Sequence, residues 1–412
     1  MRISLAVRLR GELPILNVFG VLAAAWIIYA SFYLCRVNFS IALPLIHLGL
    51  DVSHSQLGII ASGFFIVYAV GQILNGYLSA KFEPQKLVVI GIIGSSIVNV
   101  LFGLSGNFTL LLVLWMLNGY FQSLGWPTLV RVVSIIAEGR LGASFGLFNT
   151  SWAIGHVISW LLTGAIISGM DWRCGFTLNG LLFLAMGVPA ALYLISKMGR
   201  SSGGALENFT NRRDIGKSGF ELHFKMITLM ALSFFIVDSI RYGLTVYLPS
   251  YIFSIEKATF NSTLISIVFP IAGSVGMLIT GFASDKFRVE KKTLLVLGMS
   301  FATMTLIYMF PLTFQLNRLY GIVVLVVLSA LLYAIESQIT VIIPVEVVGE
   351  KHSSIAAGLI NSIGALGAFT SSIISGIIID IYGFIEVFRF WSYIQIPLIL
   401  LLSIAYLSMR RH

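Results

Sequence analysis

Two arginines lie where charged side chains are rare, inside long apolar stretches. Arg36 interrupts an apolar run from about residue 15 to 45, which at about 1.5 Å per residue is long enough to cross a bilayer. A guanidinium at that depth costs roughly 2.5–3.5 kcal/mol on insertion scales, so it must face the protein interior or a water-filled cavity. Arg241 lies in a similar run of the second half. Two buried arginines, one in each half and at matched depth, therefore predict a substrate site.

An internal repeat relates the two arginines. Arg36 and Arg241 are 205 residues apart, and so are Pro44 and Pro249. The segments 76–82 (GYLSAKF) and 281–287 (GFASDKF) keep the same offset. In a chain of 412 residues this repeat predicts two halves of similar fold. A parallel repeat of two six-helix halves places a binding site at the membrane midplane, between the halves.

The composition excludes a soluble globular domain. Hydrophobic residues make up 58% of the chain and charged residues 10%, and the mean hydropathy is +0.95. At about 30–35 residues for each helix with its loop, the length predicts about twelve membrane spans. The formal net charge of +9 would indicate nucleic acid only if the basic residues formed one surface cluster. They lie instead at the ends of the apolar runs, so no nucleic-acid partner is expected.

Dividing the apolar runs at charged residues, Gly and Pro predicts an all-α membrane protein with twelve transmembrane helices in two pseudo-symmetric six-helix bundles. The expected domains are an N-terminal half (1–197), a cytoplasmic linker (198–224) and a C-terminal half (225–412). The predicted spans lie near 15–46, 56–80, 86–106, 108–137, 141–168, 174–197, 225–254, 261–284, 292–314, 318–346, 353–380 and 384–408.

Lysine and arginine are shared unequally between the predicted loops. Nineteen lie at the two termini, in the linker and in the loops on that same side, whereas the opposite loops carry only Arg173, Lys257, Arg318 and Arg389. Cytoplasmic loops carry the excess of these residues. The bias therefore predicts a multi-pass protein of the cell (inner) membrane with both termini in the cytoplasm.

Three further polar side chains lie at predicted membrane depth. Asp238 precedes Arg241 by three residues, so the two can form an ion pair on one helix. Asp238 could be structural, could hold Arg241 until an anion displaces it, or could carry a proton. Glu336 is equally open to a proton-carrying role, a structural role or pairing with an arginine. Histidine side chains titrate near neutral pH, so His156 could couple transport to proton movement. A role in packing alone would also explain its position.

The sequence contains no spacing typical of metal ligands and no nucleophile elbow. Gly216-Lys217-Ser218 ends like a phosphate-binding loop, but Asn211 stands where that motif requires glycine, and no strand precedes it. Neither an enzyme, a cofactor nor a metal site is therefore expected.

Local motifs along nearly the whole chain resemble the organophosphate:phosphate antiporter family of the major facilitator superfamily. That family exchanges glycerol-3-phosphate or hexose phosphates for inorganic phosphate. The segment 33–44 (YLCRVNFSIALP) is similar to its first-helix signature, and Gly281 to Lys286 is similar to a loop motif of the whole superfamily. Further matches are Gly125-Trp126-Pro127 with Arg131, Phe148-Asn149-Thr150-Ser151, Asp171-Trp172-Arg173 and Ile240-Arg241-Tyr242-Gly243.

The resemblance implies that Arg36 and Arg241 bind the phosphate. It also implies roles in substrate binding for Tyr29, Tyr33 and Tyr68, which match tyrosines of the family's first two helices. Tyr29, Tyr33 and Arg36 are spaced i, i+4 and i+7, so they share one helix face.

The chain departs from the family at several pocket positions. The histidine of the fifth helix is replaced by Trp152, with His156 one turn further along. Gln72 stands where the family has a lysine in its second helix, and Val37 stands where a lysine often follows the first arginine. Asp238 stands where the family has an aromatic residue one turn before the second arginine. The pocket is thus less positive. This favours phosphate, a monoanion or an organic carboxylate over a doubly charged phosphate ester.

These inferences predict a secondary active transporter that moves phosphate or an organophosphate by alternating access, in antiport. One alternative is a proton-coupled symporter of an organic carboxylate, which Asp238 and Glu336 would serve. Another is a transporter-like membrane sensor of a phosphorylated ligand. The expected partners are the anion, a counter-anion or proton, and membrane lipid, and the expected state is a monomer.

Overall fold

The computed structural model describes residues 15–136, 141–198, 217–284, 287–348 and 353–410. Every regular element in these ranges is a helix. Twelve of the helical stretches are long and apolar enough to cross a membrane, which confirms the predicted fold class and number of spans. Most of the predicted linker (199–216) and the loop residues Asp285 and Lys286 lie outside the described residues.

Within the described residues, the first half of the chain forms eight α-helices and the second half nine. The first eight are α2 (Ile15–Phe32), α3 (Asn38–Leu50), α4 (His54–Lys81), α5 (Pro84–Leu104), α6 (Phe108–Ser123), α7 (Trp126–Ile136), α8 (Leu141–Gly169) and α9 (Trp172–Met198). The others are α11 (Lys217–Glu256), α12 (Thr259–Ser266), α13 (Val268–Ser284), α14 (Val289–Leu316), α15 (Arg318–Ser337), α16 (Ile343–Val348), α17 (Ser353–Tyr382), α18 (Phe384–Tyr393) and α19 (Gln395–Arg410).

Several predicted spans are interrupted within the membrane. The first span divides into α2 and α3 around a 3₁₀ turn (η1, Tyr33–Cys35), and the fourth divides at Gly125, next to Trp126-Pro127. Proline lacks a backbone N–H and fits the first turn of a new helix, which explains the start of α7. The tenth span passes through a π-helical turn (η2, Gln338–Ile342) between α15 and α16.

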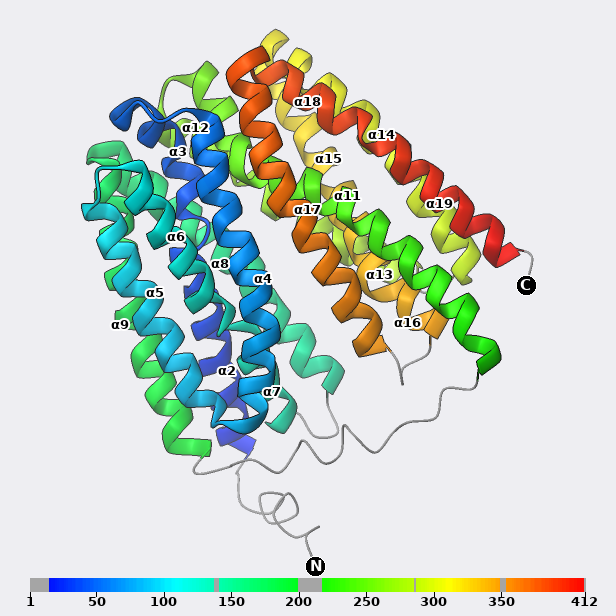
Figure 1. Cartoon of the computed structure of the whole chain (residues 1–412), viewed down its shortest axis with the longest axis horizontal. Coiled ribbons are helices and arrows are strands. Elements are labelled where there is room, and N and C mark those ends of the chain that lie inside the picture. The colour runs from blue at the N-terminus through cyan, green and yellow to red at the C-terminus, as the bar shows by residue number, and fades with distance from the viewer. Residues whose placement is uncertain (1–14, 137–140, 199–216, 285–286, 349–352, 411–412) are drawn as a thin grey trace, which may run out of the picture.

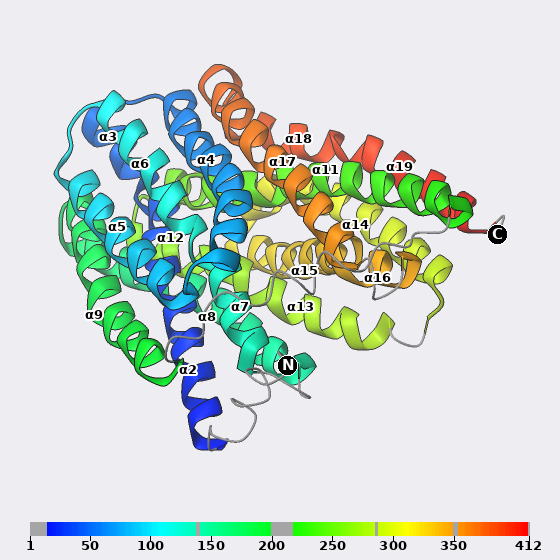
Figure 2. The same cartoon turned by 60° about the horizontal axis from the view of Figure 1, so that its bottom comes forward.

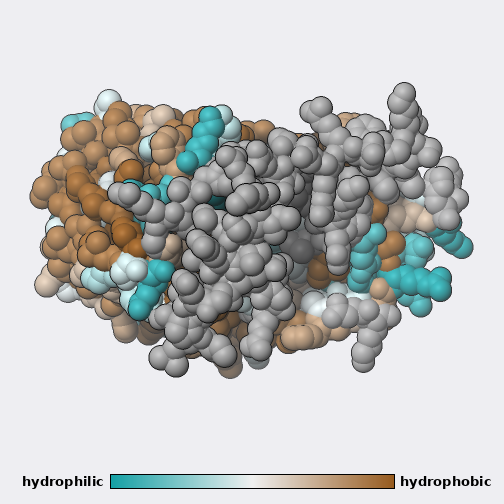
Figure 3. Space-filling view, turned by 90° about the horizontal axis from the view of Figure 1, so that it is seen from below, coloured by the Kyte–Doolittle hydropathy of each residue, from teal (hydrophilic) through white to brown (hydrophobic). Residues whose placement is uncertain are grey.

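The two halves lie close together at one end of the molecule and diverge toward the other (Figures 1 and 2). At the narrow end, α4 of the first half lies beside α17 of the second. The start of α2, the end of α9, the start of α11 and the end of α19 all lie at the wide end. Viewed from the wide end, the flanks are largely hydrophobic, as expected for helices that face lipid (Figure 3). The protein is a multi-pass integral membrane protein.

Hydrogen bonds hold the halves together at the narrow end. The carboxylate of Asp380, near the end of α17, accepts bonds from the first residues of α4: the backbone N–H groups of His54 (2.9 Å) and Ser55 (2.7 Å). The Nδ1 atom of His54 lies 3.0 Å from the same carboxylate. The hydroxyl of Tyr247 on α11 lies within bonding distance of the carbonyls of His54 and Ser372. We call this group the narrow-end latch; it consists of His54, Ser55, Tyr247, Ser372 and Asp380.

Candidate functional site

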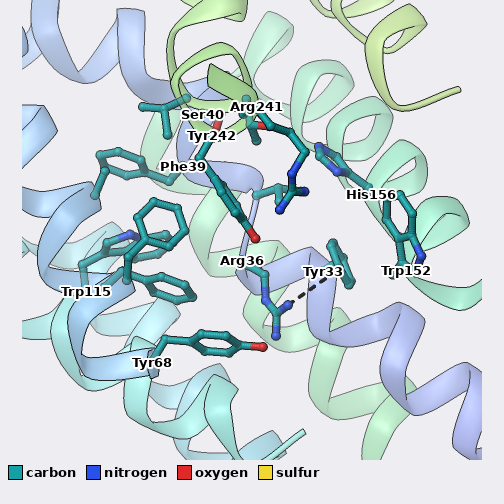
Figure 4. A pocket seen from close by; sticks show the side chains of 16 residues that line it. Tyr33, Arg36, Phe39, Ser40, Tyr68, Trp115, Trp152, His156, Arg241 and Tyr242 are labelled. Atoms are coloured by element: carbon teal, nitrogen blue, oxygen red, sulfur yellow. Dashed lines mark hydrogen bonds between the residues drawn. The ribbon is translucent and has the colours of Figure 1, made fainter. Parts of the chain in front are cut away.

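A cavity lies between the two halves, near the middle of the membrane spans. Its unfilled space, counted together with the open solvent at its mouth, is about 690 Å³, and the cavity is drawn in Figure 4. Its walls come from both halves, with η1, α3, α4, α6 and α8 on one side and α11 on the other. Sixteen residues line it: Tyr33, Arg36, Val37, Phe39, Ser40, Ala61, Phe64, Phe65, Tyr68, Trp115, Trp152, His156, Arg241, Tyr242, Thr245 and Val246.

The interruption between α2 and α3 places Arg36 at this cavity. Three backbone carbonyls near the break accept hydrogen bonds from side chains of other helices rather than only from the helix itself. Phe32 O accepts from Gln122 Nε2 (3.0 Å), Cys35 O from Asn118 Nδ2 (2.7 Å), and Val37 O from Trp160 Nε1 (3.0 Å). Because a free carbonyl inside a membrane is costly, these donors make the irregular turn stable. The predicted span near 15–46 is therefore one membrane crossing that consists of two helices joined by this turn.

The guanidinium of Arg36 has no carboxylate partner within the described chain. Its Nε donates to Gln122 Oε1 (3.0 Å), and its Nη1 lies 3.5 Å from the Tyr33 hydroxyl. Tyrosine rings surround it, with the guanidinium carbon 4.8 Å from the ring centre of Tyr33 and 4.9 Å from that of Tyr68. The Nη2 atom is buried and has no hydrogen-bond partner. Buried donors are rarely left unpaired, so this atom marks a place for an acceptor.

Arg241, in contrast, is neutralised by two carboxylates. Asp238 Oδ1 accepts from Arg241 Nε (3.0 Å) and Nη2 (2.7 Å), the ion pair that the i, i+3 spacing predicts. Glu336 of α15 places Oε2 3.1 Å from Arg241 Nε without hydrogen-bond alignment. The guanidinium carbon also lies 4.2 Å from the ring centre of Tyr242. Counted as ionised, the two carboxylates balance the two arginines, and the guanidinium donor that has no partner belongs to Arg36.

The structure brings six of the predicted site residues to the cavity wall: Arg36, Arg241, Tyr33, Tyr68, Trp152 and His156. The other three do not line the cavity but contact residues that do. Asp238 and Glu336 contact Arg241, and Tyr29 packs edge-on against Tyr33, with ring centres 5.8 Å apart.

His156 and Trp152 occupy the α8 side of the cavity. The His156 ring stacks on Tyr33, with centres 6.0 Å apart, and its buried Nε2 has no hydrogen-bond partner. Trp152 stacks on Tyr333 of α15 at 5.7 Å and 11°, so it joins the two halves beside Arg241. Both residues thus contact the groups that surround the two arginines.

Sequence reasoning missed Gln122 and the aromatic residues of the cavity wall. Gln122 is a fully buried amide of α6, one turn after the buried Asn118 and three residues before the Gly125-Trp126-Pro127 segment. A polar side chain at that depth is itself a functional signal. Phe39, Phe64 and Trp115 carried no such signal, because aromatic residues are common throughout apolar helices. Within the described ranges, no group of three His, Cys, Asp or Glu side chains could hold a metal ion.

Known proteins resemble this chain along most of its length. The sequence profile of the Major Facilitator Superfamily matches residues 25–372. The probable sulfoacetate transporter SauU of Cupriavidus necator is 25% identical over 379 residues, which cover 87% of each chain. The membrane sensor protein UhpC of Salmonella typhimurium is 26% identical over 287 residues, which cover 65% of this chain and 64% of UhpC. This chain therefore spans slightly less than two thirds of that relative.

A probable hexose phosphate transport protein of Chlamydia trachomatis is 24% identical over 289 residues, covering 64% of this chain and 63% of the relative. Among solved structures, the nucleoside transporter NupG superposes with a TM-score of 0.73 at 10% identity, covering 95% of this chain and 99% of NupG. At that identity the likeness concerns the fold.

Proposed function

Because this chain belongs to the major facilitator superfamily, whose fold and relatives are those of transporters rather than enzymes, we propose that it is a secondary active transporter of a small anion. The buried Nη2 of Arg36 carries this proposal. It is a charged donor without an acceptor, in a cavity between the halves. An oxyanion there would accept from Nη2 and gain a charge-assisted hydrogen bond in a medium of low dielectric.

Alternating access follows from the position of the cavity. An anion on Arg36 also approaches Arg241 and Tyr242 of the other half, so it favours the conformation in which both halves close around it. A ligand shifts an equilibrium only through such a difference in contacts between the two states. Because cytoplasmic loops carry the excess of lysine and arginine, we infer that the wide end, where α2 begins and α19 ends, faces the cytoplasm. The structure then represents an inward-open state.

We propose exchange of phosphate or an organophosphate as the mode of transport, and a relative named as a probable hexose phosphate transport protein supports the substrate class. In the empty protein, closing the wide end would remove the remaining water from the half-buried side chain of Arg36, whose charge no carboxylate balances, and this is costly. A bound anion removes that cost, so the loaded protein changes conformation more readily than the empty one. The absence of net charge around the arginines favours a head group of low charge, such as monovalent phosphate, a carboxylate or a sulfonate.

Proton-coupled symport is the second candidate, and the two carboxylates on Arg241 favour it. An anion that draws Arg241 away would leave Asp238 and Glu336 buried and unpaired, and such a carboxylate is stabilised by taking up a proton. The UhpC relative adds a sensor to the alternatives. A sensor would bind the anion without carrying out exchange at a useful rate.

Transport in proteoliposomes decides between these functions. We expect labelled phosphate to enter vesicles preloaded with phosphate, at fixed pH and in the absence of a proton gradient. Uptake that requires the gradient and is lost in Asp238→Asn would support symport instead. Unchanged uptake in Asp238→Asn would remove both the gating and the proton-carrying role of this residue. Binding of anions without flux under either condition would identify a sensor and contradict transport.

Gln122 should set the affinity for the anion through Arg36. Replacing Gln122 with Leu removes the acceptor of Arg36 Nε and the donor to Phe32 O. Hydrogen bonds to charged groups contribute about 1.5–3 kcal/mol, so we expect the apparent affinity for phosphate in the exchange assay to fall about tenfold or more. The matched control is Gln395→Leu, since Gln395 is also fully buried but contacts Thr303, away from the cavity. Equal losses in both variants would show a general folding defect rather than a role in positioning Arg36.

A further inference from the structure

The cavity wall around Arg36 is apolar and aromatic to an unusual degree for a site that binds a polyol. Phe39, Phe64, Phe65 and Trp115 lie among the lining residues, together with Val37, Ala61 and Val246. None of the sixteen described residues that line the cavity is Asn, Gln, Asp or Glu. A sugar has a hydroxyl on nearly every carbon, and each hydroxyl taken from water needs a partner.

Three of the five hydroxyl groups of the wall, those of Tyr33, Tyr68 and Thr245, already have polar partners, whereas no such partner is present for Ser40 and Tyr242 among the described residues. The Tyr68 hydroxyl accepts from Gln72 Nε2 (2.6 Å), and Thr245 Oγ1 donates to the backbone oxygen of Arg241 (2.8 Å). The Tyr33 hydroxyl faces Arg36 Nη1 at 3.5 Å. Among lining side chains, the buried polar atoms without a partner are Arg36 Nη2 and His156 Nε2. Two such atoms can hold one head group, and the hydroxyls of Ser40 and Tyr242 then remain for the body of the ligand, which is fewer than the hydroxyls of a sugar.

The aromatic rings that line the cavity also pack against one another, some face to face and some edge to face. Phe64 and Tyr68 stack at 5.7 Å and 11°, and Phe65 meets Tyr242 edge-on at 4.7 Å across the two halves. Tyr68 and Tyr242 both direct their hydroxyl ends into the space around Arg36 (Figure 4). A planar apolar group would find stacking and edge-to-face partners here, and it would leave few polar atoms unpaired.

We propose that the transported anion has a planar, apolar body, and that it is an aromatic carboxylate or sulfonate rather than a sugar phosphate. This inference rests on the proposed anion transport and specifies its substrate class. The head group binds Arg36 Nη2, and the body lies against the aromatic wall formed by Phe39, Phe64, Phe65 and Trp115.

Binding of matched anion pairs to the purified full-length protein tests the proposal. Benzoate and gluconate share a carboxylate but differ in the body, and phenyl phosphate and glucose 6-phosphate share a phosphate. Trp115 and Trp152 line the cavity, so tryptophan fluorescence and the thermal unfolding midpoint can both report binding. We expect the aromatic member of each pair to bind at least tenfold more tightly. Equal or tighter binding of gluconate and glucose 6-phosphate would overturn the proposal.

Two variants separate this inference from the proposed function. Phe65→Asn introduces an amide into the wall and should reduce the preference for benzoate over gluconate, whereas Phe65→Leu should largely retain it. Arg36→Gln should weaken all four anions. If all four bind with equal affinity and all depend on Arg36, the substrate class is wrong and anion binding stands. If uncharged benzyl alcohol binds as tightly as benzoate and Arg36→Gln changes nothing, the anion site itself is wrong.

Discussion

Replacing Arg36 with lysine is expected to weaken anion binding by about 10- to 150-fold. Lysine keeps the positive charge but lacks the planar fork, so it cannot donate to Gln122 and to an anion in the directions that Nε and Nη2 provide. Loss of one charge-assisted hydrogen bond costs about 1.5–3 kcal/mol, which corresponds to this range. The apparent affinity for phosphate in the exchange assay measures it.

Two other arginines give the comparison for this experiment. Arg389→Lys changes an exposed arginine that pairs with Glu386 on its own helix, and it should leave the affinity unchanged. Arg241→Lys should lose less than Arg36→Lys, because an ammonium can still neutralise Asp238 and Glu336. Transport retained at normal affinity in both Arg36→Lys and Arg241→Lys would contradict anion binding by these arginines.

The fold was predictable because it depends on properties that a single sequence displays. Long apolar runs define the twelve spans, and a repeat of constant offset relates Arg36 to Arg241. The ion pair between Asp238 and Arg241 was predictable for the same reason, since neighbours at i and i+3 meet on one helix face.

The break before Arg36 was not predictable, because its cause lies in other helices. Neither Gly nor Pro occurs between Tyr33 and Val37 to signal it. The turn exists because Gln122, Asn118 and Trp160 donate to the carbonyls that the break leaves free. These donors are more than 80 residues away along the chain, so only the folded arrangement identifies them.

The difference between the two arginines also emerges only in three dimensions. The offset of 205 residues relates Asp238 to Tyr33, so the second half has a carboxylate where the first has a phenol. Glu336 approaches Arg241 from α15, a contact that the sequence left open among three roles. The repeat suggests two equivalent arginines, whereas the structure pairs one with carboxylates and leaves a donor of the other free.

The narrow-end latch should control which end of the protein opens. The carboxylate of Asp380 accepts from the N–H groups of His54 and Ser55, so it caps α4 from the other half and also meets the positive end of the helix dipole. Opening the narrow end must break these bonds. Asp380→Asn removes the negative charge and one acceptor, and we expect a loss of about 2 kcal/mol for the closed narrow end. That loss shifts the conformational equilibrium about 30-fold toward opening there.

Thiol labelling in the cavity measures this shift. The chain has two cysteines, Cys35 and Cys174, so a background without cysteine requires two substitutions. A single Ser40→Cys at the cavity wall then reacts with a membrane-impermeant reagent added on the narrow-end side only when that end opens. Asp380→Asn should raise the labelling rate by more than tenfold. The control Asp171→Asn changes an exposed carboxylate that pairs with Arg173 within the first half, and it should have no effect. An unchanged rate in Asp380→Asn would mean that packing of α4 against α17, rather than the latch, keeps the narrow end closed.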